Sequence, residues 1–277
     1  MPRRSSTVRA REFGAGVREA IRRAGLTGRG AAALAGWDHA KLSDLINGKG
    51  GVTEVELSRL LGICRTPADE HEHLLRLFRE ASTSGWLQLH GEKLPVQVRT
   101  LVEHEAQATE IIVWSLTLVP GLLQMPDYMR TLMLASPNVP DPKIDEYVMA
   151  RVARQKIIEG RRQFTFYIHE QALRLPVGSS PVVMSDQLDH LQQMNMRPYI
   201  TMRVVPTAIG AHPGTSGSFT LMKFSNVEPI VFLDTENSSV FLDDKASFEV
   251  YSRILKALDA VALDAAESKE LIARIAT

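Results

Sequence analysis

The chain has 277 residues, of which 44% are hydrophobic, enough to bury the core of one large domain or of two ordinary ones. Lys and Arg together number 32, as do Asp and Glu, but residues 1–50 hold ten bases against four acids, a net charge of +6, which leaves −6 for the remainder. The single cysteine, Cys64, excludes an intramolecular disulfide, and no stretch approaches the ~18 to 20 uninterrupted apolar residues of a membrane helix.

The first segment, residues 1–8, is rich in Arg, Ser and Thr and is expected to be a flexible arm. It lacks the apolar stretch of a secretion signal, so a cytoplasmic protein is expected. From Arg9 to Ala24 apolar residues recur at helical spacing and predict the first helix. Its other faces carry Arg11, Arg18 and Arg22.

Two short helices that meet at a glycine are predicted between Leu26 and Lys49. Thr27 is a favourable N-cap for the first, Gly36 allows the left-handed turn that ends it, and Asp38 caps the second. The second helix packs inward through Leu42, Leu45 and Ile46. Its outer face is small or polar, with His39, Ala40, Ser43, Asp44 and Asn47. This pattern predicts a helix-turn-helix whose second helix fits the major groove of B-DNA, although an ordinary helical pair within a bundle is the alternative.

The segment resembles the lambda-repressor-like, or Xre-type, helix-turn-helix family. The resemblance is carried by Leu26, Thr27, Ala32, Gly36, Leu42, Leu45 and Gly48, with the ending LINGK. It implies that bases are read by Gly28, His39, Ala40, Ser43 and Asp44. It implies DNA backbone contacts by Arg29, Lys41, Asn47 and Lys49. Gly28 and Asp44 depart from the family pattern, in which a polar side chain and Arg are common; a carboxylate there can accept from cytosine N4, so the departure concerns which site is read.

The basic character of the first 50 residues suits attraction to phosphate. Arg3 and Arg4 fit either an arm that enters a minor groove or a solvated terminus. Two further helices, starting near Thr53 and Pro67, complete a five-helix bundle over residues 9–82. A small polar stretch, residues 82–85, then marks the domain boundary.

Residues 83–277 predict a mixed domain with a small, largely antiparallel sheet and several helices, so the chain is assigned to the α+β class. Alternating patterns predict strands at residues 164–168, 199–205, 218–224, 229–234 and 240–243. A connector and a helix are expected at 86–107, and a strand or an irregular segment at 110–118. Other helices are expected at 126–135, 145–162, 185–194, 251–262 and 267–275.

Four ordered motifs in this domain, VPGLLQMPDY, ARVARQ, HEQALRLPVG and AHPGTSGSFTLMKF, resemble the C-terminal domain of bacterial regulators described as antitoxin-like. The resemblance implies a transcriptional regulator, often paired with a small partner protein encoded nearby. It supplies no agreed ligand for the domain.

No motif predicts catalysis. The loop at residues 210–218 lacks the Gly-Lys-Ser/Thr ending of a phosphate-binding loop, and EHEAQ at 103–107 lacks the second histidine of a zinc-binding helix. We therefore expect no enzymatic activity, no metal and no cofactor. Trp114, Tyr128, Glu170 and His212 are candidates to line a ligand pocket.

The sequence thus predicts a regulator that binds double-stranded DNA as a homodimer, with residues 38–47 in the major groove and the second domain for dimerisation and for a partner or a signal. Two alternatives stay open. One is an antitoxin-like module that neutralises a small partner protein, and the other is a switch gated by a metabolite.

Overall fold

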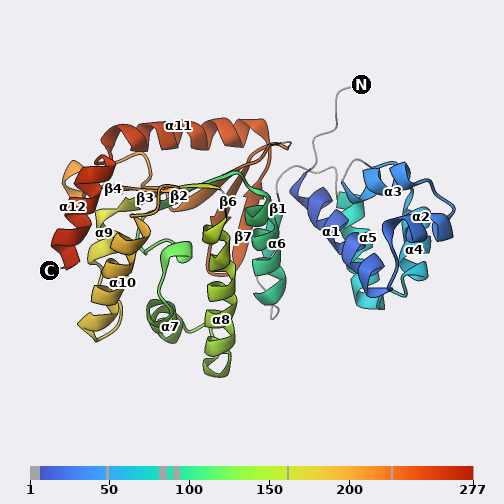
Figure 1. Ribbon diagram of the computed structural model, residues 1–277, viewed down its shortest axis with the longest axis horizontal. Helices are drawn as coiled ribbons and strands as arrows, with labels where there is room; N and C mark the ends of the chain where they lie inside the picture. The colour runs from blue at the N-terminus through green and yellow to red at the C-terminus, as the bar shows by residue number, and fades with distance from the viewer. Residues whose placement is uncertain are drawn as a thin grey trace.

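The computed structural model describes residues 7–47, 50–80, 86–89, 94–160, 162–225 and 227–276. They form a helical bundle and a larger domain built on one sheet (Figure 1). Residues 1–6 of the predicted arm, and the predicted boundary at residues 82–85, lie outside the described residues.

Five helices make up the bundle: α1 (Val8–Arg23), α2 (Gly28–Ala35), α3 (His39–Ile46), α4 (Glu54–Ile63) and α5 (Ala68–Glu80). In the first four, an N-cap side chain accepts a hydrogen bond from the amide three residues later; these caps are Thr7, Thr27, Asp38 and Thr53. At Thr53 the Glu56 carboxylate returns a bond to the N-cap backbone and completes a capping box. The predicted helical bundle is confirmed.

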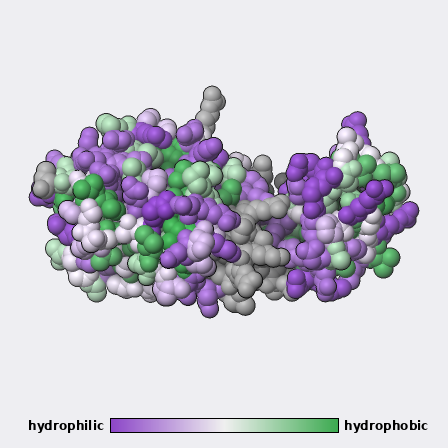
Figure 2. All heavy atoms as spheres, turned by 90° about the horizontal axis from the view of Figure 1, so that it is seen from below, coloured by the Kyte–Doolittle hydropathy of each residue, from purple (hydrophilic) through white to green (hydrophobic). Residues whose placement is uncertain are grey.

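The bundle packs through small side chains on α2 and larger apolar side chains on the other helices. Ala31, Ala32 and Ala35 on α2 are at most 3% exposed, and their short side chains let α2 lie close to α3 and α4. The apolar centre contributed by the other helices comprises Phe13, Val17, Leu42, Leu45, Leu57, Leu60, Leu61 and Leu74. Figure 2 shows that one face of the molecule is largely hydrophilic, with apolar residues in separate patches.

A seven-stranded mixed sheet forms the centre of the second domain, with strand order β1-β7-β6-β5-β2-β3-β4. The strands are β1 (Trp86–Leu89), β2 (Glu110–Ser115), β3 (Gln163–His169), β4 (Ile200–Val205), β5 (Phe219–Lys223), β6 (Ile230–Asp234) and β7 (Ser238–Leu242). β2 pairs in parallel with β3, and β3 with β4; the other four neighbouring pairs are antiparallel. The predicted α+β class is confirmed.

Helices cover both faces of the sheet. They are α6 (Leu94–Gln107), α7 (Pro126–Ala135), α8 (Ile144–Gln155), α9 (Glu170–Arg174), α10 (Pro181–Met194), α11 (Lys245–Val261) and α12 (Ala265–Ala276). α11 lies across one face, and α7 to α10 lie on the other, where α12 packs against α10 and β4 (Figure 1). Because β2 is covered on both sides, neighbouring residues Ile111 and Ile112 are both buried, in separate core clusters.

Two predicted elements differ from the structure. Residues 86–89, expected as part of a connector, form β1, because they pair with β7 from Trp86 opposite Phe241 to Leu89 opposite Ser238. The helix expected at 145–162 ends at Gln155 and continues as a 3₁₀ turn, Lys156–Glu159, which buries Ile158 before the chain enters β3.

Candidate nucleic-acid interface

The turn between α2 and α3 depends on Gly36. This residue has φ 75°, in the left-handed region that glycine adopts without steric cost. The amide of Trp37 then donates to the carbonyl of Ala32 (2.8 Å) and that of Gly36 to Ala33 (3.1 Å). These bonds satisfy the last carbonyls of α2 and fix the direction in which α3 begins.

The outer face of α3 carries the residues that the sequence assigns to base reading. Leu42 and Leu45 are each 1% exposed and anchor the helix, whereas His39, Ala40 and Asp44 are exposed and Ser43 is half-buried. A Cβ placed on Gly28 would lie 4.0 Å from Nε2 of His39. The first residues of α2 and α3 therefore adjoin and present one continuous surface.

The predicted backbone contacts differ in their surroundings. Lys41 is half-buried, and its Nζ lies 2.6 Å from a carboxylate oxygen of Glu56 and 5.2 Å from the ring centre of Trp37. Arg29 is exposed at the start of α2. Asn47 is exposed, and its side-chain amide donates to Ser43 (3.3 Å). Lys49 lies outside the described residues.

A shallow cleft of about 460 Å³ borders this surface. Its lining residues are Arg18, Ile21, Arg22, Gly25, Leu26, Gly28, Leu42 and Ile46. Arg18 donates to the carbonyl of Ile46 (3.0 Å), and exposed Arg22 pairs with Glu19 (2.6 Å). The cleft thus places two guanidinium groups beside the predicted reading surface, although the helix-turn-helix pattern alone did not assign them to it.

The beginning of α1 contacts the second domain instead. The amide of Val8 donates to Oδ2 of Asp243 (2.5 Å), a residue 235 positions later in the turn between β7 and α11. The guanidinium of Arg11 lies 5.1 Å from the ring centre of Phe224 and donates to the carbonyl of Glu228 (3.5 Å). Asp243 therefore caps the first helix of the bundle from the other domain.

Helix α6 contributes a buried histidine to the same region. Nδ1 of His104 is 2.7 Å from the carbonyl of Thr100, and its ring packs against Phe241 with centres 5.7 Å apart. Burial lowers the pKa of His104 from 6.5 to about 4, and the charge of Arg11 acts in the same direction. The region where the two domains meet therefore contains a histidine that is neutral above about pH 4.

Of the four residues predicted to line a pocket, the structure brings two together. The rings of Trp114 and His212 are 5.3 Å apart at their centres, and His212 stacks on His169 at 4.9 Å. Nε1 of Trp114 donates to the carbonyl of Gly214 (2.9 Å). This aromatic group closes the carboxyl end of β2 and β3.

The other two lie elsewhere. Tyr128 and Trp114 belong to different core clusters. The hydroxyl of Tyr128 accepts a hydrogen bond from the amide of Val119 (3.2 Å). The Glu170 carboxylate accepts the amide of Thr207 (2.9 Å) and lies 2.7 Å from Nε of Arg174. Tyr128 therefore stays apart from the aromatic group, and Glu170 lines a different cavity.

Several motif residues of the second domain hold its loops in place. Arg154 forms a bidentate pair with Glu105, which is fully buried (2.6 and 2.7 Å). Gln155 donates to the carbonyls of Gly121 (3.0 Å) and Gln124 (2.7 Å). The ARVARQ motif thus ties α8 to α6 and to the VPGLLQ segment.

Comparisons with known families agree with this architecture. A family described as helix-turn-helix domain matches residues 12–74, and a family described as domain of unknown function (DUF5753) matches residues 98–274. No curated protein and no solved structure matches the chain. Among the described residues, no helix has the length and apolar character needed to cross a membrane. Because the second match covers more than half of the chain, this is a member of the DUF5753 family that carries an N-terminal helix-turn-helix domain for DNA binding.

Proposed function

We propose that the chain is a sequence-specific transcriptional regulator of the Xre type that places α3 in the major groove. The observation that carries this proposal is the outer face of α3, where exposed His39, Ala40 and Asp44 stand on a helix that is capped and anchored by buried leucines. A helix in the groove needs side chains that are short or polar on that face and a rigid base behind them.

The protein acts as a homodimer in this proposal. One bundle of this size covers little DNA, and two copies related by a twofold axis read half-sites about one helical turn apart. The proposal also places the protein in the cytoplasm and assigns it no catalysed reaction.

The test is selection of bound duplexes from a random DNA pool by the full-length protein at physiological salt. Non-specific binding weakens steeply with salt, so enrichment there reports sequence reading. The proposal predicts a palindrome with half-sites about ten base pairs apart. Failure to enrich any sequence would contradict it and would favour the antitoxin-like role, which co-purification of a small partner protein with the chain would test.

A separate observation favours a switch gated through the second domain. The start of α1 contacts that domain twice: the amide of Val8 donates to Asp243, and Arg11 contacts Phe224 and Glu228. A ligand or partner that moves the turn between β7 and α11 would change both the cap of α1 and the orientation of the bundle. The expected result is that DNA affinity differs between the full chain and an Asp243→Ala variant, measured on the selected site; equal affinity would contradict the gated switch.

A further inference from the structure

A pocket of about 440 Å³ lies at the carboxyl ends of β3 and β4, away from the bundle. Its lining residues are Glu170, Arg174, Pro206, Leu263, Leu271 and Arg274. Glu170 directly follows β3, Pro206 directly follows β4, and the other side is formed by α12. The volume falls in the range of small-molecule sites.

The wall that α12 forms is fixed by hydrogen bonds. The hydroxyl of Ser268, a fully buried residue, accepts the amide of Val204 (2.9 Å) and donates to the carbonyl of Leu263 (3.3 Å). Asp264 and Glu267 cap α12 reciprocally, each accepting the other's amide at 2.8 to 2.9 Å. These bonds hold α12 in place beside β4.

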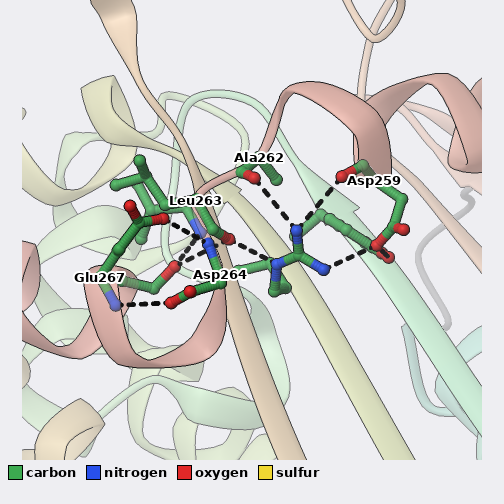
Figure 3. A network of polar contacts seen from close by, with 9 residues as sticks. Asp259, Ala262, Leu263, Asp264 and Glu267 are labelled. Atoms are coloured by element: carbon green, nitrogen blue, oxygen red, sulfur yellow. Dashed lines mark hydrogen bonds and ion pairs between the residues drawn. The ribbon is translucent and has the colours of Figure 1, made fainter.

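Arg203 holds the turn between α11 and α12. Its guanidinium donates to the carbonyls of Leu263, Ala262 (3.0 Å) and Asp259 (3.2 Å), and it pairs with the Asp259 carboxylate (2.8 Å). The accepting residues Asp259, Ala262 and Leu263 are labelled in Figure 3. These bonds satisfy carbonyls at the end of α11 and just beyond it, and they hold the turn into α12.

The polar part of the lining consists of two guanidinium groups and one carboxylate. The carboxylate of Glu170 is 13% exposed and uses one oxygen on the amide of Thr207 and the other on Nε of Arg174. Arg174 has no other hydrogen bond within the described residues, so its two terminal nitrogens are available as donors. Arg274 adds a second guanidinium from α12.

The remaining lining is apolar and comes from Pro206, Leu263 and Leu271. A guanidinium group recognises a carboxylate in a planar, bidentate manner, and an apolar wall beside it is suited to an aliphatic chain. We propose that this pocket binds a small aliphatic carboxylate, with its head group at Arg174 and Arg274 and its chain against Leu263 and Leu271. This inference goes beyond DNA binding and is tested without DNA.

The test is calorimetric titration of the full chain with hexanoate, hexylamine and inorganic phosphate as probes. Hexanoate is expected to bind, and hexylamine is not, because both oxygens of the one carboxylate in the lining, Glu170, already accept hydrogen bonds from Arg174 and Thr207. Arg174→Gln and Arg274→Gln should each weaken hexanoate binding about tenfold, since each removes a charged hydrogen-bond donor. Arg253→Gln, at an exposed position on α11, is the matched control and should leave binding unchanged.

Three results would overturn the proposal: no heat of binding with hexanoate, equal affinity of both arginine variants and the control, or inorganic phosphate binding as tightly as hexanoate. The last would mean that the apolar wall contributes nothing. Thermal unfolding of each variant checks its fold. If Arg174→Gln unfolds early because Glu170 loses its partner, exposed Arg274 decides the question.

Discussion

Individual residues of the DNA-binding bundle are constrained by partners that lie outside their own helix. Lys41 occupies a position that the sequence assigns to phosphate contact, yet its Nζ is 2.6 Å from Glu56 on α4. The same carboxylate also accepts the amide of Thr53 (2.8 Å). In the proposed DNA complex, Lys41 would therefore exchange the Glu56 carboxylate for a phosphate.

Glu56→Gln is expected to strengthen DNA binding. The amide still completes the capping box with Thr53 but no longer neutralises Lys41, so affinity should rise about two- to fivefold at low salt and less at high salt. Glu54→Gln is the matched control, because Glu54 lies on the same helix and pairs with Arg79. Fluorescence anisotropy measures both; an equal gain in the two variants would show that only net charge matters.

Gly214 provides a residue-scale test of packing in the second domain. A Cβ at this position would lie 2.4 Å from Cε2 of Trp114, which is fully buried. Gly214→Ala should therefore lower the free energy of unfolding by about 1–3 kcal/mol. Gly62, on α4, has open space around it, and Gly62→Ala should raise that free energy by ~0.5–1 kcal/mol. Urea unfolding distinguishes them, and a Gly214→Ala variant as stable as Gly62→Ala would contradict the packing.

At the scale of elements, local signals in the sequence were sufficient for the bundle. Thr27, Asp38 and Thr53 cap the helices as predicted, and Gly36 ends α2 in the left-handed conformation. These features depend on residues within one turn of each other, so the sequence carries them directly. The outer face of α3 follows from the same periodicity.

Elements that depend on distant partners were less predictable. The strand β1 has only four residues and is defined by pairing with β7, about 150 positions later. The end of α8 is set by the burial of Ile158 and by the bonds of Gln155 to Gly121 and Gln124. The capping of α1 by Asp243 likewise has no local signal, because the donor and acceptor are 235 residues apart.

Removing that distant cap should loosen α1. In Asp243→Ala the amide of Val8 loses its acceptor and Arg11 loses a nearby counter-charge, at a cost of about 0.5–2 kcal/mol. Hydrogen exchange followed by mass spectrometry should show faster exchange in the first turns of α1. Asp186→Ala, at an exposed position on α10, is the control, and the same exchange in both variants would contradict trans-capping.

At the scale of the whole molecule, stability should fall in mild acid because of His104. Its pKa is 6.5 when unfolded and about 4 in the folded protein, since burial disfavours the imidazolium. Between these values the unfolded chain binds more protons, so the free energy of unfolding decreases as pH falls from 6.5 to about 4, by on the order of 3 kcal/mol. Below that range the contribution is lost and changes no further.

Unfolding in urea at a series of pH values measures this dependence. His104→Gln should flatten the curve between pH 6.5 and 4, whereas His39→Gln, at an exposed position, should leave it as in the unaltered protein. A curve of unchanged slope in His104→Gln would show that other groups cause the loss of stability.

The two candidate sites, like the elements of the fold, differ in how far they can be predicted from the sequence. The outer face of α3, to which the proposal assigns base reading, could be predicted from the sequence because a helix-turn-helix is a local pattern. The cavity of Glu170 could not, because β3, β4 and α12 meet there only in the folded chain, and Arg174 and Arg274 are 100 residues apart. The sequence alone gives no strand order, and this is why it groups Glu170 with Tyr128 rather than with those two arginines.

The most direct test of the account compares DNA selections by the unaltered protein and by His39→Ala under identical conditions. His39 is exposed at the start of α3, so its removal should erase the preference at one base position in each half-site and leave the rest of the palindrome and its spacing intact. If the two selected sequences were identical at every position, α3 would not be the element that reads DNA.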